Sequence, residues 1–164
     1  MVLQLSSKID PGEYNAHVLS LDSNSNSLLS QFTKNGIKVD SLGVQKNIFS
    51  IFSAIARLHS YLKKNQISII HAHLYHALVL AGLTKLISPS LKIIWTSHSA
   101  RQTSFIRNLM VFLTLPMRKH DILFMEDMQT WYTKKRYSII PNGVELQKAK
   151  HDLKKYDTFT FISV

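Results

Sequence analysis

The chain of 164 residues has the length of one ordinary domain, and its composition of 45% hydrophobic and 18% charged residues is that of a folded protein. Twenty Lys and Arg residues against ten Asp and Glu residues give a net charge of +10, which indicates an anionic partner such as phosphate, a nucleotide, nucleic acid or an acidic membrane face. The absence of cysteine excludes a disulfide scaffold, a cysteine-based zinc site and a cysteine nucleophile.

Short β-rich runs alternate with helical segments along the chain. Strands are expected over residues 17–21, 37–39, 67–70, 91–96, 122–125 and 137–140. Apolar residues at helical spacing predict helices over residues 28–34, 47–65 and 75–87. Strands that are apolar almost throughout, separated by helices, are typical of a parallel sheet that is covered on both faces. The sequence therefore predicts an α/β fold with a Rossmann-like, doubly wound, mostly parallel sheet, whose ligands bind beyond the carboxyl ends of the strands.

Four histidines follow two of the expected strands. His71, His73 and His76 come after the strand over 67–70, and His98 follows the strand that ends at Thr96. Residues at alternate positions of an extended segment share a face, so His71 and His73 are expected to point the same way. An imidazole at a strand end can hold a sugar hydroxyl, a phosphate oxygen or a metal. We therefore expect a site that includes His73 and His98, whereas His76 is expected to be structural.

A metal site built on these histidines is an alternative. Such a site needs a third or fourth ligand, and the only acidic residues near a strand end are Asp121 and Asp127. Asp121 is expected to begin its strand, which places it at the wrong edge of the sheet. A metal-dependent hydrolase that uses His71, His73 and His98 is therefore the less favoured interpretation, and we expect no metal.

Residues 105–120 combine a strongly apolar run with flanking cations. A buried helix with a basic end is the commoner arrangement, but the segment can also lie on an anionic membrane with Arg107, Arg118 and Lys119 on lipid headgroups. The helix over 47–65 is expected to bury one apolar stripe that includes Ile51 and Phe52.

Cations and aromatic residues are interleaved at one place, where Trp131 and Tyr132 stand near the basic run 134–136. This pattern keeps a non-catalytic nucleotide or nucleic-acid binding module as a second alternative. No signal peptide and no membrane-spanning run is expected, which favours a cytoplasmic protein. A peripheral position at the inner face of the cytoplasmic membrane stays open through residues 105–120.

Four motifs occur in a characteristic order. They are Ile-Ile-His-Ala-His over 69–73, Thr96-Ser97-His98, Asp121 before a hydrophobic strand, and Ile-Pro-Asn-Gly-Val-Glu over 140–145. This order resembles the N-terminal domain of family 4 glycosyltransferases, which are retaining sugar-transfer enzymes of GT-B architecture. The resemblance covers residues from about Val18 to the end of the sequence.

The resemblance implies an acceptor-side half of an enzyme that transfers a hexosyl group from a nucleotide-sugar to a lipid-linked or polysaccharide acceptor. It implies a catalytic role for His98, which matches the family histidine beside the transferring sugar. His71 and His73 match the acceptor-side loop, and Thr96 and Ser99 are expected to bind the acceptor with them. The interdomain hinge is expected at Pro141, Asn142, Gly143 and Val144. The nucleotide-sugar is a substrate, and no cofactor and no nucleic-acid partner are expected.

The resemblance also implies a domain organisation. Residues 1–144 match the N-terminal domain without its first strand, residues 145–157 match the interdomain linker, and residues 158–164 match the first strand of a donor-binding domain. The family's Gly-Gly loop, its Arg and Lys pair for the diphosphate, and its paired glutamates do not occur in the sequence. We therefore expect a fragment that is truncated at both ends and inactive alone, with the donor domain on a separate chain as one option.

Overall fold

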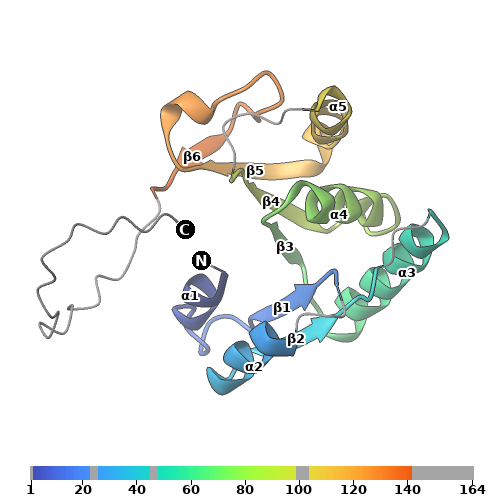
Figure 1. The fold of residues 1–164 in the computed structure, drawn as a ribbon, viewed down its shortest axis with the longest axis vertical. Helices are drawn as coiled ribbons and strands as arrows, with labels where there is room; N and C mark the ends of the chain where they lie inside the picture. The colour runs from blue at the N-terminus through green and yellow to red at the C-terminus, as the bar shows by residue number, and fades with distance from the viewer. Residues whose placement is uncertain (1, 23–25, 45–47, 99–103, 142–164) are drawn as a thin grey trace, which may run out of the picture.

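The computed structural model describes residues 2–22, 26–44, 48–98 and 104–141. Helices and strands alternate along these residues (Figure 1). The helices are α1 (Val2–Ser7), α2 (Asn26–Lys34), α3 (Ile48–Lys64), α4 (Tyr75–Ile87) and α5 (Phe105–Leu113), with 3-10 turns η1 (Leu115–Met117) and η2 (Glu126–Met128). The strands are β1 (His17–Ser20), β2 (Lys38–Ser41), β3 (Ile69–Ala72), β4 (Lys92–Thr96), β5 (Arg118–Leu123) and β6 (Tyr137–Ile139).

The strands form two sheets in which every neighbouring pair is parallel. β1 pairs with β2, and a second sheet has the strand order β3-β4-β5-β6. Parallel strands joined through helices are the arrangement expected from the sequence, so the Rossmann-like α/β fold is confirmed. The carboxyl ends of β3 and β4 lie side by side, because Ile69 is paired with Lys92 and Ala72 with Trp95.

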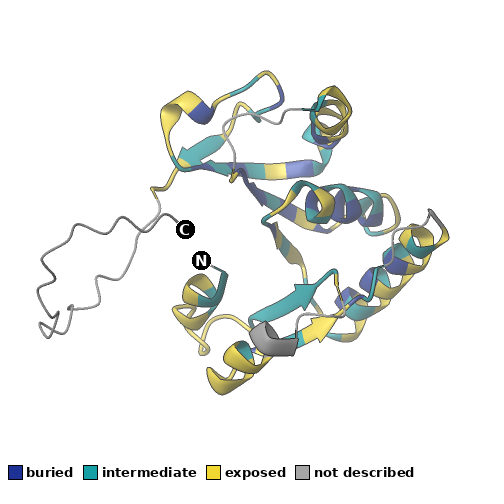
Figure 2. Cartoon of the chain, viewed as in Figure 1, coloured by how far each residue is buried: buried dark blue, intermediate teal, exposed yellow. Residues whose placement is uncertain are grey.

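The hydrophobic core lies where α3 and α4 pack against the strands. Leu58 and Leu62 of α3 meet Leu78 and Ala81 of α4, and all four side chains are buried. The β4 residues Ile93 and Trp95 are buried in the same cluster. Figure 2 shows this buried band running through α4 and the strands beside it. The core therefore fixes β3 and β4, the two strands whose ends carry the histidines.

The first half of α3 does not bury the apolar stripe that its sequence predicts. Ile51 is 40% exposed and Phe52 is 67% exposed, whereas Leu58 and Leu62 are buried. The reason is positional, because the buried residues of α3 begin at Ala54 and the first turns of the helix extend beyond the core (Figure 2). A helical apolar stripe shows which face can be buried, but not how far a neighbouring element reaches.

The structure corrects two expectations for residues 105–121. Helix α5 ends at Leu113, a 3-10 turn with Pro116 follows, and β5 already begins at Arg118. Asp121 therefore lies inside its strand rather than at the start. Arg118 is 2% exposed and forms an ion pair with Asp121, with 2.7 Å between Nη1 and Oδ2. The sequence analysis counted Arg118 among the cations that can contact lipid headgroups. This is wrong for Arg118, because its guanidinium is buried in the pair with Asp121.

Candidate functional site

Three of the predicted histidines gather at the carboxyl ends of β3 and β4. His71 is the third residue of β3, and His73 follows the strand directly. Thr96 ends β4, and His98 stands two residues beyond it. The parallel pairing of β3 with β4 brings these two chain segments together. We call His71, His73 and His98 the imidazole row.

Short contacts join the members of the imidazole row to one another and to Thr96. His71 Nε2 lies 2.6 Å from Thr96 Oγ1, and His73 Nδ1 lies 3.3 Å from His98 Nε2. The ring centroids are 4.2 Å apart between His71 and His73, and 5.5 Å apart between His73 and His98. The structure therefore brings together four of the predicted site residues in one connected group.

Burial keeps the imidazole row uncharged at neutral pH. Burial, with further contributions from His71 and His98, lowers the pKa of His73 to about 4. Burial lowers the pKa of His71, and the neighbouring His98 lowers it further. Burial also lowers the pKa of His98. Taking an imidazolium out of water, or placing a second one beside it, costs free energy, and both effects favour the neutral ring.

A neutral imidazole carries one N–H donor and one acceptor nitrogen. A row of three such rings can therefore donate to and accept from the hydroxyl groups of a sugar, while a free ring nitrogen can take a proton. In the contact between His73 and His98, one nitrogen carries the hydrogen and the other accepts it, so the tautomers of the two rings are coupled. His71 and His98 keep exposed edges, which leaves the row open to a ligand.

Phe124 is a part of this site that the sequence analysis missed. It follows β5 directly, and its ring meets His98 edge-on with 5.3 Å between the ring centroids. The signal was present in the sequence, since a residue just after the third neighbouring strand belongs to the same edge of the sheet. The sequence analysis placed Phe124 inside the strand expected over 122–125, whereas β5 ends at Leu123, directly before it.

Other predicted residues lie apart from the row or outside the described residues. His76 stacks near Tyr75 on α4, with 3.6 Å between the ring centroids, and makes no contact with the row that the structure records. Pro141 is exposed at the end of the described chain. Ser99, the hinge residues Asn142, Gly143 and Val144, the linker 145–157 and the strand 158–164 fall outside the residues that the structure describes.

The structure also describes residues on which the two alternative interpretations rest. Within the described ranges, no group of three or more His, Cys, Asp or Glu side chains is placed to hold a metal ion. Asp121, one of the two carboxylates considered as a ligand, is fully buried in its pair with Arg118. Tyr132 is also buried, which leaves Trp131 as the exposed aromatic residue beside the basic run 134–136.

The fold and the site together define a Rossmann-like α/β domain with a hydrogen-bonding site at the carboxyl edge of its sheet. A family model described as Glycosyltransferase Family 4 matches residues 2–148. The chain therefore belongs to glycosyltransferase family 4, whose architecture is GT-B, and this membership supports glycosyl transfer as the general reaction. No curated protein and no solved structure shows a significant match to it.

Proposed function

We propose that this domain binds the acceptor in the transfer of a hexosyl group from a nucleotide-sugar to a lipid-linked or polysaccharide acceptor. The observation that carries the proposal is the neutral imidazole row at the carboxyl ends of β3 and β4 in a chain of this family. Neutral donors and acceptors suit the hydroxyl groups of a sugar, which carry no charge.

The residues of the site have distinct roles in this proposal. His98 lies next to the sugar that is transferred, and its contact with His73 fixes the orientation of its ring. His71 and Thr96 hold acceptor hydroxyls, and their own contact of 2.6 Å accommodates either tautomer of His71, since the Thr96 hydroxyl can donate or accept. Ser99 belongs to the same acceptor-binding set in the sequence, and it falls outside the described residues.

We propose further that the domain alone does not turn over. The leaving nucleoside diphosphate carries negative charge, and such a transfer needs cations or backbone N–H groups aimed at that charge. The imidazole row is neutral at neutral pH because burial lowers the pKa of its members, so the row itself does not supply this charge. A donor-binding domain, on the same or a separate chain, is needed to hold the diphosphate.

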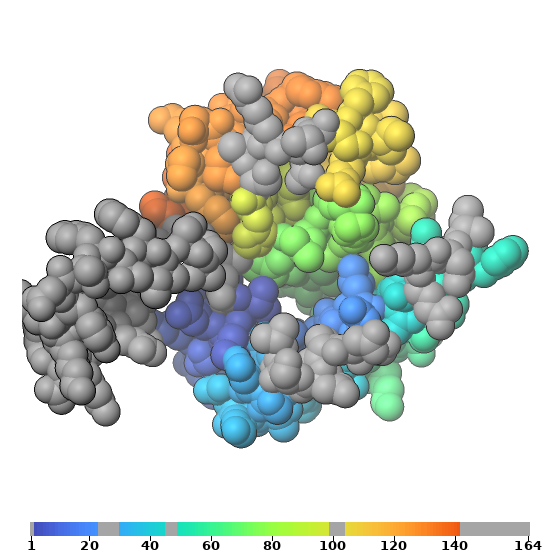
Figure 3. Space-filling view, in the orientation of Figure 1, coloured from blue at the N-terminus to red at the C-terminus, as the bar shows by residue number. Residues whose placement is uncertain are grey.

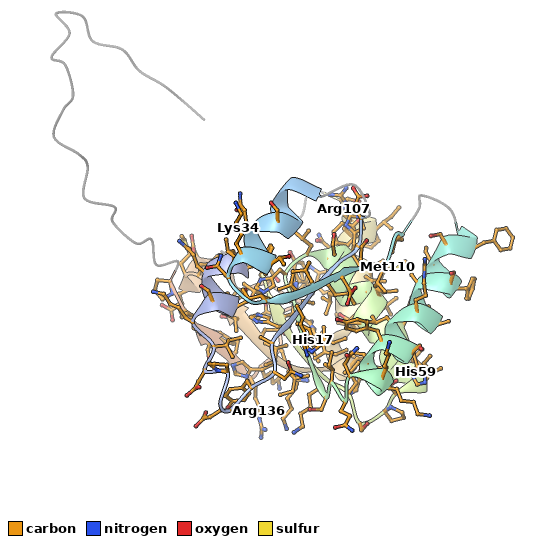
Figure 4. The ribbon with its side chains drawn as sticks, turned by 90° about the horizontal axis from the view of Figure 1, so that it is seen from below. His17, Lys34, His59, Arg107, Met110 and Arg136 are labelled. Carbon is orange, nitrogen blue, oxygen red and sulfur yellow. The ribbon has the colours of Figure 1, made fainter. Side chains whose placement is uncertain are left out.

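Acceptor binding can be tested on the chain itself. Side-chain NMR spectra of the histidines, recorded while a hexose-containing acceptor analogue is added, should show saturable shifts of His71, His73 and His98. His59 of α3, labelled in Figure 4, is the internal control because it bonds Ser88 through Nδ1 at 2.7 Å and lies outside the row. Equal shifts for His59, or no saturable shift of the row, would speak against the proposed acceptor site.

Catalysis can be tested by joining the chain to a donor-binding domain of another family member. Release of nucleoside diphosphate from a UDP- or GDP-hexose is expected only from the joined protein. In that protein His98→Ala should lower kcat by about 100-fold or more, which is the usual contribution of a group that assists proton transfer. His59→Ala should leave kcat unchanged. Full activity of His98→Ala would remove His98 from the catalytic role.

We propose that α5 brings the domain to an anionic membrane, where a lipid-linked acceptor would be found. Its exposed apolar side chains include Phe105, Ile106 and Met110, which are 73%, 66% and 40% exposed. Figure 3 shows α5, in yellow, at the outer surface of the molecule. Arg107, which lies over the Tyr75 ring at 4.9 Å, and Lys119 supply exposed cations nearby. Apolar side chains flanked by cations are typical of helices that lie in a membrane interface.

The contact would be peripheral. None of the helices within the described residues is long and apolar enough to cross a membrane. Among the cations of residues 105–120, Arg107 and Lys119 are exposed, whereas Arg118 is buried.

A further inference from the structure

The contact between His73 and His98 holds one hydrogen, so the hydrogen bond has a direction. His73 Nδ1 lies 3.3 Å from His98 Nε2. His71, the third member of the imidazole row, lies beside His73 with 4.2 Å between the ring centroids, and its Nε2 contacts Thr96 instead. A neutral imidazole has one N–H donor and one acceptor nitrogen. The ring that donates therefore decides the tautomers of both His73 and His98.

Both rings of this contact are neutral at neutral pH. Burial, with smaller contributions from His71 and His98, lowers the pKa of His73 to about 4. Burial is also the largest cause that lowers the pKa of His98. If both rings were imidazolium ions, two N–H groups would face each other and no hydrogen bond would form. The neutral pair leaves two arrangements of the shared hydrogen.

The two arrangements present opposite groups to a ligand. In the first, His73 donates from Nδ1 to Nε2 of His98, so the hydrogen of His98 resides on Nδ1. In the second, His98 donates from Nε2 to Nδ1 of His73, so both rings have their hydrogen on Nε2. His98 Nδ1 is thus a donor in the first arrangement and a bare acceptor in the second.

The chemistry of the imidazole ring favours the second arrangement. In a neutral histidine side chain the hydrogen resides preferentially on Nε2, because Nδ1 is closer to the electron-withdrawing backbone and is the weaker base. Both rings have this preferred tautomer in the second arrangement, and neither has it in the first. Within the described ranges, neither ring makes a further hydrogen bond that would oppose the preference.

The nitrogens that face away from the contact are accessible. His98 is exposed, and its recorded contact uses Nε2, which leaves Nδ1 for a ligand. Among the ring nitrogens of the described residues, the one that is buried without a partner is Nε2 of His17. Nε2 of His73 is therefore not sealed from solvent. A sugar hydroxyl can donate and accept, so it can bind to either nitrogen.

We propose that His73 is a positioning residue, which holds His98 in the Nε2–H tautomer and leaves Nδ1 of His98 as a bare acceptor toward the ligand. This role rests on the proposed function for the nature of the ligand, which is an acceptor sugar. One hydroxyl of that sugar donates to Nδ1 of His98, and a second accepts from the Nε2–H of His73. The pair thereby distinguishes a hydroxyl that gives its hydrogen from one that receives a hydrogen.

The tautomer of His98 can be measured on the chain itself, without any transfer reaction. In long-range 1H–15N NMR spectra of histidine side chains, a bare ring nitrogen and an N–H nitrogen resonate in separate regions. At neutral pH we expect Nδ1 of His98 to be bare and Nε2 of His98 to carry the hydrogen, with the same tautomer for His73. An Nδ1–H tautomer of His98 in the unaltered chain would overturn the proposal.

Two substitutions of His73 test whether this residue selects the tautomer. His73→Leu removes the acceptor, so the spectrum of His98 should shift toward a mixture of the two tautomers. His73→Asn keeps an acceptor oxygen near the place of Nδ1 and should restore the Nε2–H tautomer. His59→Leu on α3 is the matched control outside the row and should leave the spectrum of His98 unchanged.

Each variant has an outcome that contradicts the proposal. If His98 has the same tautomer population in His73→Leu as in the unaltered chain, His73 does not select it. If His73→Asn behaves like His73→Leu, the effect comes from ring packing and not from the hydrogen bond. Circular dichroism checks that the variants are folded, and the spectrum of the unaltered chain tests the direction of the bond even where a variant is not.

The protein joined to a donor-binding domain provides a second readout. There His73→Leu should lower kcat/KM by about tenfold or more, because His98 is no longer held in one orientation and tautomer. His73→Asn should recover most of this loss, and equal loss in both variants would contradict the positioning role. If the joined protein releases no nucleoside diphosphate at all, the proposed transfer function fails, whereas the tautomer measured on the chain alone is unaffected by that result.

Discussion

His73 occupies the centre of the imidazole row, where two other rings and the surrounding protein remove it from water. Burial and the neighbouring rings lower its pKa from 6.5 to about 4. Between these two pH values the unfolded chain binds a proton at this position and the folded chain does not. The free energy of unfolding should therefore fall as the pH decreases from about 6.5 to about 4, and level off below that. The same sign holds for His71 and His98, whose pKa values are also lowered by burial.

Urea unfolding at several pH values measures this effect. For His73→Gln the loss of stability between neutral pH and about pH 4 should be smaller than in the unaltered chain, by on the order of 1 kcal/mol after allowance for partial exposure. His59→Gln on α3 is the matched control and should keep the full loss. An identical loss in His73→Gln and in the unaltered chain would show that this ring is solvated.

Arg118 and Asp121 make a buried pair that holds β5 against the segment following it. Arg118 Nη2 donates to the Tyr132 carbonyl at 2.6 Å, and the Lys134 N–H donates to Asp121 Oδ2 at 2.7 Å. The guanidinium also lies 4.8 Å from the centre of the Trp95 ring, on the neighbouring strand. The pair is thus bonded to backbone groups on both of its members, whereas Arg118 Nε and Asp121 Oδ1 are buried without a hydrogen-bond partner.

Breaking this pair should destabilise the domain strongly. Asp121→Ala leaves a buried guanidinium without its carboxylate, and we expect a loss of about 3 kcal/mol or more in the free energy of unfolding. The double variant Arg118→Met with Asp121→Leu removes both charges and should lose less than Asp121→Ala. Chemical denaturation of the three proteins measures the difference. If Asp121→Ala unfolds like the unaltered chain, the pair has no structural role.

At the scale of elements, most apolar side chains of α5 are exposed to solvent, because Val111 is the only buried residue of this helix. Replacing Phe105 and Ile106 together by serine should lower binding to phosphatidylglycerol vesicles by about tenfold or more, because two large apolar side chains leave the interface. Phe49→Ser on α3 is the control, since Phe49 is 81% exposed but lies on another helix. Cosedimentation with vesicles, repeated with neutral phosphatidylcholine, provides the measurement. An equal effect of Phe49→Ser would mean that the binding does not depend on α5.

Elements with a clear pattern could be predicted from the sequence, and those held by distant partners could not. The helix expected over 75–87 is α4 with the same bounds, because its apolar run is long and uninterrupted. The start of β5 was placed four residues too late, because Arg-Lys-His-Asp over 118–121 does not resemble a buried strand. Its burial depends on Tyr132 and Lys134, which lie more than ten positions further along the chain.

The grouping of His71, His73 and His98 could be predicted for a related reason. Its members stand directly after strands, and the rule that ligands bind beyond the carboxyl ends of parallel strands singled out His71, His73 and His98. The order of the strands was not predictable in detail, so the edge-on contact of Phe124 with His98 was missed. The apolar cavity lined by residues of β1, β3, α3 and α4 could likewise not be predicted, since it depends on how these distant elements pack.

At the scale of the whole molecule, the positive charge is not concentrated in the imidazole row. The net charge of +10 counts every histidine as neutral, and burial lowers the pKa of all three members of the row, which agrees with that count. Arg118 is compensated by Asp121 in the core. The excess of cations is therefore available to attract an anionic surface rather than to stabilise charge at the site.

The division into two sheets predicts two regions of different stability. β4 and β5 each contain several buried residues, whereas β1 contains none and no ladder joins it to β3 in the described part of the chain. Local opening needs less free energy where fewer apolar contacts are lost. We therefore expect the amides of β1 and β2 to exchange with deuterium at least about tenfold faster than those of β4 and β5. Mass spectrometry of peptic fragments after timed exchange measures both regions in one sample, and equal protection would show that the two sheets open as one unit.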